Sequence, residues 1–313
     1  MLGRTAQGLF WMFRYLERCE NTARMLEAGA RIAITRWEDA NDEWGSILTT
    51  TGSRTDYLAL HDQIEGPKVI DFLLREKANP SSVRASIASA RTNARAVRTA
   101  LTREVWEAVN EAWMNICDAL ENPVSDAQLP AALNLIRQQA ALVRGSLYGT
   151  MLRNDIYDFA RLGTFIERAD STARILDVKY YVLLPSVRMV GSQLDNVQWE
   201  TILRSVSAFR SYNWICGGDI TPTGIADFLI FDRRMPRSLA FCTSTIAENL
   251  AYLASAYGIT SMSLSLAEAR DRAMREMTIE DVMDTGLHEY LTEFLGTTAS
   301  LAAQIEADFR FIG

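Results

Sequence analysis

The sequence predicts an all-α fold, a single multi-helix bundle that contains two related long helices. Apolar residues recur at helical spacing along most of the 313 residues, whereas the strict alternation of a half-buried strand is scarce. An eight-residue phrase occurs twice, as ERCENTAR at 17–24 and as ERADSTAR at 167–174, with five identical positions. No low-complexity linker divides the chain, so we expect one domain over residues 1–313.

Helical periodicity predicts the elements in order. They are residues 5–35, 68–78, 81–120 (with a break near 101 left open), 126–149, 154–184, 195–212, 223–232, 236–258, 265–277 and 280–311.

Residues that end or begin helices set the boundaries of these elements. Proline lacks an amide hydrogen and disrupts a helix interior. Six prolines are accordingly placed at breaks: Pro67, Pro80, Pro123, Pro185, Pro222 and Pro236. We expect Ser81 and Asp126 to cap the helices that follow them, and Pro236 to occupy the first turn of its helix.

Two stretches lack periodicity. Residues 36–66 and 213–224 are expected to be surface connections, with a functional loop as the less favoured alternative. The second stretch contains ICGGDITPTG, whose glycines do not have phosphate-binding spacing, so we interpret it as a turn. Because no other nucleotide or cofactor motif is visible, we predict no cofactor.

Composition excludes several classes of function. The net charge of −7 argues against a general nucleic-acid binder. No run approaches the ~18 apolar residues of a membrane span, and the N-terminus lacks signal-peptide features. Four scattered cysteines without a CxxC pair favour a reduced, cytoplasmic compartment. Two histidines are too few to favour zinc sites or histidine-based triads.

The first repeated phrase places charge beside apolar residues. At about 100° per residue, Glu17, Glu20 and Glu27 share a sector with the apolar side of their helix. Arg24 stands one turn from both Glu20 and Glu27, so these side chains can pair. Arg18 points about 100° away, towards a more polar edge.

The second phrase repeats this arrangement. Glu167, Asp170, Arg174 and Asp177 occupy the same angles, and Arg168 points towards the polar edge. Isolated burial of a charge costs several kcal/mol, so each acidic stripe needs cations or an open cleft. One arginine within each stripe does not balance three acids.

A basic stripe is a candidate source of the missing cations. Arg84, Arg91, Arg95 and Arg98 fall within a ~60° arc of one predicted helix. We expect this stripe to face one or both acidic stripes. The alternative is that it lines a cleft for an anionic ligand, since the arginine fork suits carboxylate and phosphate equally well.

Three interpretations of these charged residues remain. An architectural lattice between long helices is favoured, and a ligand or catalytic cleft with perturbed acids comes second. A Mg²⁺ or Mn²⁺ site comes last because the arginines would compete with the cation, so we predict no metal.

A separate anion-binding candidate follows Pro236. Arg237 and Ser238 are expected in the first turn of a helix, where free amide groups attract anions. The favoured alternative is a capped helix start with solvated arginines.

The sequence resembles the bacterial alpha-E family, an all-helical domain with an ER motif. The resemblance spans residues 1 to about 312 and includes SARTNARAVRTAL, EVWEAVNEAW and ADFLIFDRRMPRSLAFC besides the two ER phrases. The motif maps to Glu17, Arg18, Glu167 and Arg168, without catalytic roles.

The resemblance also implies which proteins are encoded near this one. Alpha-E proteins tend to be encoded beside, or fused to, ATP-grasp and transglutaminase-like proteins. We therefore expect an accessory or substrate-organising partner of an ATP-grasp-type ligase in bacterial peptide synthesis or protein tagging. The alternatives are an enzyme that acts on a peptide or amide bond through its Glu and Asp residues, and a purely structural scaffold, which includes a homo-oligomer.

Overall fold

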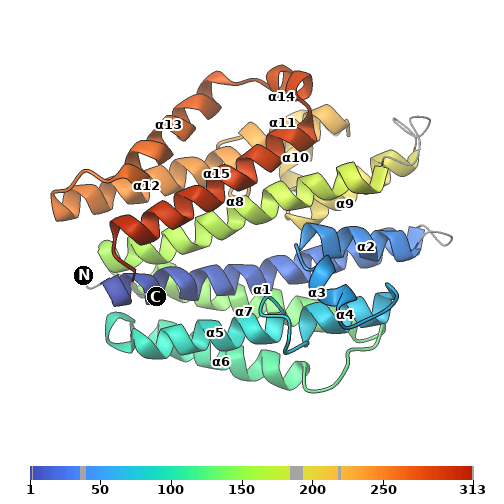
Figure 1. Cartoon of the computed structure of the whole chain (residues 1–313), viewed down its shortest axis with the longest axis horizontal. Helices are drawn as coiled ribbons and strands as arrows, with labels where there is room; N and C mark the ends of the chain where they lie inside the picture. Colours follow the sequence, from blue (N-terminus) through green and yellow to red (C-terminus); the bar gives the residue numbers. More distant parts are fainter. Residues whose placement is uncertain (2, 36–39, 184–192, 218–219, 312–313) are drawn as a thin grey trace.

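The computed structural model describes residue 1 and residues 3–35, 40–183, 193–217 and 220–311 (Figure 1). Within these ranges the chain forms fifteen α-helices and no strand, which confirms the predicted all-α class. None of the helices in the described ranges combines the length and the apolarity that a membrane span requires.

The helices carry the following bounds. They are α1 Gly3–Thr35, α2 Ala40–Thr50, α3 Arg54–Leu58, α4 Gly66–Leu74, α5 Val83–Ala96, α6 Arg103–Ala119, α7 Leu129–Thr150, α8 Asp155–Leu183, α9 Gln193–Ser205, α10 Phe209–Cys216, α11 Pro222–Phe231, α12 Leu239–Tyr257, α13 Met262–Glu276, α14 Ile279–Thr285 and α15 Leu287–Asp308.

The two ER helices, α1 and α8, lie side by side along the centre of the molecule (Figure 1). They are parallel, because Phe10 of α1 lies against Gly163 and Arg18 reaches Glu167 further along. A Cβ atom at Gly163 would lie 2.1 Å from the Phe10 carbonyl oxygen. Only glycine therefore allows the two backbones to approach this closely.

The remaining helices form two similar halves around this pair (Figure 1). In the first half α5 and α7 pack on α1, with α6 against both; in the second half α12 and α15 pack on α8, with α13 against both. A short helix of each half also packs on the ER helix of the other half: α2 packs on α8, and α9 packs on α1. Each half has its own apolar core, and both ER helices contribute to both cores. The organisation as one domain over residues 1–313 stays a prediction.

Several predicted boundaries are wrong. The described part of 36–66 contains α2 and α3 and is not irregular, and α10 extends into 213–224 as far as Cys216. The helix predicted at 195–212 breaks at Ser207, whose φ is 57°. The one predicted at 280–311 breaks at Gly286, with φ of 101°. The break near 101 is confirmed, since Leu101 is extended between α5 and α6.

The predicted caps also need correction. Ser82, not Ser81, caps α5, and its Oγ accepts from the Ala85 amide. Asp126 caps nothing, because α7 begins three residues later after Gln128. Pro236 precedes α12 instead of occupying its first turn. Pro185 lies outside the described residues.

Candidate functional site

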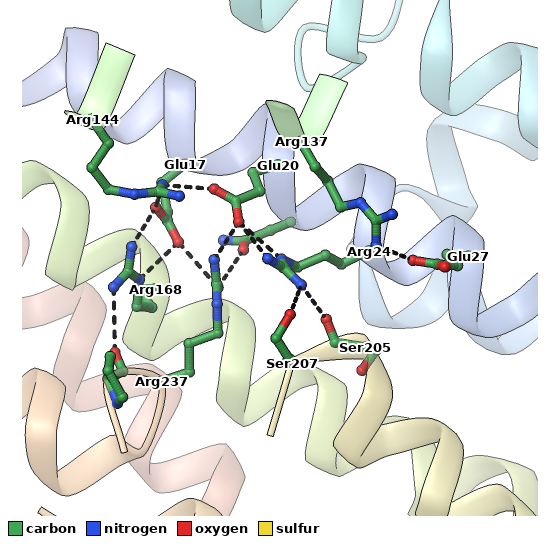
Figure 2. Close-up of polar contacts among 12 residues, drawn as sticks. Glu17, Glu20, Arg24, Glu27, Arg137, Arg144, Arg168, Ser205, Ser207 and Arg237 are labelled. Atoms are coloured by element: carbon green, nitrogen blue, oxygen red, sulfur yellow. Dashed lines mark hydrogen bonds and ion pairs between the residues drawn. The ribbon is translucent and has the colours of Figure 1, made fainter. Parts of the chain in front are cut away.

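The two ER dipeptides pair reciprocally across the α1–α8 contact. Arg168 donates from Nε and Nη2 to the Glu17 carboxylate, at 2.9 Å each (Figure 2). Arg18 donates in the same way to Glu167, at 2.6 and 3.1 Å. Each acid of the repeated motif is thus held by the arginine of the other copy.

The polar edge predicted for Arg168 is therefore wrong, whereas the side chain of Arg18 is 24% exposed. Arg168 is only 6% exposed, and Glu17 is 1% exposed. Angles within one helix place a residue on a face, but other helices cover α1 and α8 on most sides. The supposed edge is the face on which the two helices meet.

Two arginines from outside the repeated phrases complete the first acid pair. Arg144 of α7 bridges Glu17 and Glu20, with Nη1–Oε2 distances of 3.1 and 2.6 Å. Arg237, just before α12, places Nη2 2.7 Å from Glu20 Oε1 and Nη1 3.1 Å from Asn21 Oδ1 (Figure 2). The side chains therefore converge from α1, α7, α8 and the segment before α12.

The last arginine of each phrase pairs with its own acid and also caps a distant helix. Arg24 bonds Glu20 and donates to the carbonyl of Ser205, the last residue of α9, at 2.9 Å. Arg174 bonds Asp170 and donates to the carbonyl of Thr50, the last residue of α2, at 3.1 Å. Both predicted i,i+4 pairs are confirmed, and each arginine satisfies a free helix-terminal carbonyl.

The third acid of each stripe pairs elsewhere. Glu27 is bound by Arg137 of α7, not by Arg24, so the expected contact between Glu27 and Arg24 is wrong (Figure 2). Asp177 lies 2.7 Å from His288 Nδ1 on α15. The two halves again use corresponding helices.

The basic stripe does not face the acidic stripes, which corrects the prediction. Arg84 points towards the Leu120 carbonyl, 3.5 Å away. Two others stack on tryptophans of α6: Arg91 on Trp113 and Arg98 on Trp106, at 4.0 and 5.2 Å from the ring centroids. Arg95 is exposed. The aromatic faces of α6 offer these guanidinium groups a cation–π contact instead.

The structure also shows the roles of the two residues of the candidate anion-binding site, 237 and 238. Ser238 is the N-cap of α12, with Oγ accepting from the Phe241 amide at 3.0 Å. Arg237 is not solvated, since it is 6% exposed and bonds the carboxylates of Glu17 and Glu20. The anions beside Arg237 are therefore the chain's own side chains.

These contacts hold the buried acids in the charged form. Burial alone would raise the pKa of Glu17, but the charges of Arg168, Arg237 and Arg144 outweigh it and hold the pKa well below its usual range. The same balance, led by Arg237, lowers the pKa of Glu20 to about 2. The pKa of Glu167 is also lowered, by Arg18 and Arg14.

The chemistry open to the lattice is limited. A general acid or base works best with a pKa near the operating pH, and these carboxylates are far from it. Burial raises the pKa of the Cys19 thiol, so a thiolate nucleophile is disfavoured as well. Among the residues that the structure describes, no group of three or more His, Cys, Asp or Glu side chains is arranged to hold a metal ion.

The prediction from sequence missed a second repeat that supplies Arg237. Asp71-Phe72-Leu73 recurs as 227–229, and Pro80 and Ser82 recur as 236 and 238, each 156 residues later (71 and 227, 80 and 236, 82 and 238). Both serines cap the helix that follows. The repeat was visible in the sequence and would have shown that Arg237 corresponds to Ser81.

Comparisons with known proteins find that this chain resembles part of longer proteins. An uncharacterized protein of Mycobacterium bovis, Mb2597, is 25% identical over 319 residues that cover 95% of this chain and 35% of the relative. The uncharacterized protein Rv2567 of Mycobacterium tuberculosis is 24% identical with the same coverage. The chain thus spans about a third of the length of these curated relatives. No solved structure matches it significantly.

The family comparison agrees with the geometry. The profile of Alpha-E, described as a predicted alpha-helical domain with a conserved ER motif, matches residues 1–309. The two ER dipeptides form the reciprocal pairs at the centre of the fold. The chain therefore belongs to the Alpha-E family.

Proposed function

We propose that this chain is a non-catalytic accessory module that organises the substrate of an ATP-grasp-type amide or peptide ligase, in bacterial peptide synthesis or protein tagging. The observation that carries the proposal is the complete pairing of Glu17 and Glu20 by four arginines. Carboxylates held in this way stabilise a shape and do not transfer protons.

Two further points support the accessory role. The family resemblance implies ATP-grasp and transglutaminase-like neighbours, so a ligase is the expected partner. The curated relatives are nearly three times as long as the stretch they share with this chain, which is consistent with a module that works beside other domains. An ATP-dependent ligase works where ATP is present, so we propose the cytoplasm as the compartment.

Co-purification tests the partner role. The tagged chain is expressed together with the ATP-grasp protein encoded nearest to it, and the two are separated by size exclusion with and without nucleotide and candidate peptide. The proposal expects a stable complex and faster ATP consumption by the ligase when the chain is present. Failure to associate under all four conditions, with no effect on ATP consumption, rejects the partner role.

One observation favours a catalytic alternative, although not at the ER phrases. Asp158 lines a pocket of about 760 Å³ together with Asn249 and Tyr257. Burial raises the pKa of Asp158 to about 6, close to the value that suits a general base at neutral pH. An enzyme that acts on a peptide or amide bond would use this carboxyl group.

The catalytic alternative has its own test. The isolated chain is assayed for cleavage of a pool of peptide amides, next to Asp158→Asn and the exposed control Asp126→Asn. Turnover that Asp158→Asn abolishes and Asp126→Asn retains would establish an enzyme. No turnover by the unmodified chain leaves the accessory role as the favoured function.

A further inference from the structure

A pocket of about 330 Å³ lies beside the second ER phrase. Glu167, Asp170, Ser171, Ser81 and Asn21 are among its lining residues. We propose that this pocket binds the guanidinium group of a ligand, which takes the place that Arg237 fills beside the first phrase.

The internal repeat identifies corresponding positions around the two acid pairs. At the ER spacing of 150 residues, Glu17, Glu20 and Asn21 correspond to 167, 170 and 171, and at the later spacing of 156 residues Arg237 corresponds to Ser81. Glu17, Glu20 and Asn21 are the three residues that Arg237 contacts. Their counterparts all line the pocket, and so does Ser81.

Small residues in the second half leave the space open. Ser81 ends at a short hydroxymethyl group where its counterpart extends a guanidinium group. On the side of α15, the helix that corresponds to α7, the pocket is lined by Ala299, whereas α7 supplies Arg144 to the first acid pair. One long cationic side chain of the first site, Arg237, therefore has a short counterpart in the second, and α15 presents an alanine to the pocket.

The count of cations also differs between the sites. The first acid pair is within ion-pair distance of four arginines, namely Arg24, Arg144, Arg168 and Arg237. The second pair has three within the described part of the chain, namely Arg14, Arg18 and Arg174. One guanidinium ligand would give the second pair of carboxylates four guanidinium groups, the number that already surrounds the first pair.

One buried hydroxyl group at the pocket lacks a hydrogen-bond partner in the described part of the chain. Ser171 is 5% exposed, and its Oγ has no hydrogen-bond partner among the described residues. Buried polar atoms are nearly always satisfied, so a ligand group is the expected partner of the Ser171 hydroxyl.

A guanidinium group fits this set of acceptors better than an ammonium group. Its planar fork can place one N–H on the Asp170 carboxylate and a second on the Ser171 hydroxyl, as Arg237 does on Glu20 and Asn21. Asp170 has capacity for it, since its one ion-pair partner among the described residues is Arg174. The ligand is either a small guanidine or an arginine side chain of a peptide.

Calorimetric titration of the full chain tests the proposal with four probes. Agmatine and L-arginine represent small guanidines, a short peptide with an internal arginine represents the peptide source, and putrescine is the matched diamine control. We expect a guanidinium probe to bind with a stoichiometry of one and to raise the melting temperature, and putrescine to bind at least about tenfold more weakly.

Variants assign the binding to this pocket. Ser81→Arg inserts the side chain of the first site and should abolish binding of the guanidinium probe. Ala78→Arg adds the same charge at an exposed position of the same segment and should leave binding unchanged. Asp170→Asn, with folding verified by circular dichroism, should weaken binding at least about tenfold and provides a readout if Ser81→Arg does not fold.

Three outcomes overturn the proposal: no guanidinium probe binds the unmodified chain, binding persists in both Ser81→Arg and Asp170→Asn, or inorganic phosphate competes for the same site. The proposal does not depend on the ligase partner, because the isolated chain is titrated. A failed titration leaves the partner role standing, and a failed co-purification leaves the pocket standing.

Discussion

The Arg168 guanidinium group donates two hydrogen bonds of 2.9 Å to the Glu17 carboxylate, and both side chains are almost completely buried between α1 and α8. The pair has a counterpart in Arg18 and Glu167, so the two copies of the ER motif bind each other. Removing one partner from such a pair leaves an uncompensated buried charge. The reciprocal pairs therefore fix how the two halves of the fold meet.

Glu17→Gln should destabilise the fold by about 3 kcal/mol, because Arg168 and Arg237 would then share a neutral amide. Urea unfolding followed by circular dichroism measures the change. Glu107→Gln serves as the matched control, since its pair with Arg103 lies on the surface, and should leave the midpoint unchanged. An equal response of the two variants would refute the architectural interpretation.

Arg24→Met should cost more stability than Arg174→Met, although both remove a cap from a helix end. The side chain of Arg24 is 10% exposed and bonds Glu20 and Ser205, so we expect a loss of about 3 kcal/mol. The side chain of Arg174 is 34% exposed, and we expect about 1 kcal/mol. Urea midpoints give the order, and hydrogen exchange in the last turns of α9 and α2 shows which helix end loosens. The reverse order would contradict the assignment of these caps.

Stability should fall steeply in acid. The folded-state pKa of Glu20, about 2, lies below the ~4.3 of an unfolded glutamate, so the unfolded chain binds more protons in this interval. The stabilisation is present above pH ~4.3 and is lost as the pH falls towards 2. Unfolding free energies measured from pH 5 to pH 2 give the slope, which Glu20→Gln should flatten. An unchanged slope in that variant would show that other groups cause the acid unfolding.

Asp158 should have the opposite effect on stability, which it lowers as the pH rises. Burial raises its folded-state pKa to about 6, above the ~3.9 of an unfolded aspartate, so its stabilisation is present below pH ~4 and is lost as the pH rises through 6. Asp158→Asn should raise stability at pH 7 by about 1 to 2 kcal/mol and remove this part of the pH dependence. Thermal melts at pH 4, 5, 6 and 7 measure it. A variant that is less stable at pH 7 would show that the ionised carboxylate has a favourable partner.

Local spacing in the sequence predicted what depends on one helix alone. The all-α class and the pairs Glu20–Arg24 and Asp170–Arg174 follow from periodicity and i,i+4 spacing, and the structure contains them. Helices α2 and α3 were not predicted, because both are short and contain few apolar residues. Short helices depend on tertiary packing more than on propensity.

Contacts between distant segments were not predictable from the same spacing. Arg84, Arg91 and Arg95 lie on α5 and Arg98 lies just after it, but only the packed structure shows that tryptophans of α6 lie against Arg91 and Arg98. Two of the four cations that reach the first acid pair, Arg144 and Arg237, stand on segments without an ER phrase. The 156-residue repeat was the one signal in the sequence that could have related Arg237 to the first half.

A double-mutant cycle on Glu17 and Arg168 tests the central claim, that the ER motif stabilises the fold by reciprocal pairing. The unfolding free energies of Glu17→Gln, Arg168→Met and the double variant are measured in urea against the unmodified chain. We predict that the double variant is less destabilised than the sum of the single variants by about 2 kcal/mol. Single-variant losses that add to within about 0.5 kcal/mol would contradict the claim.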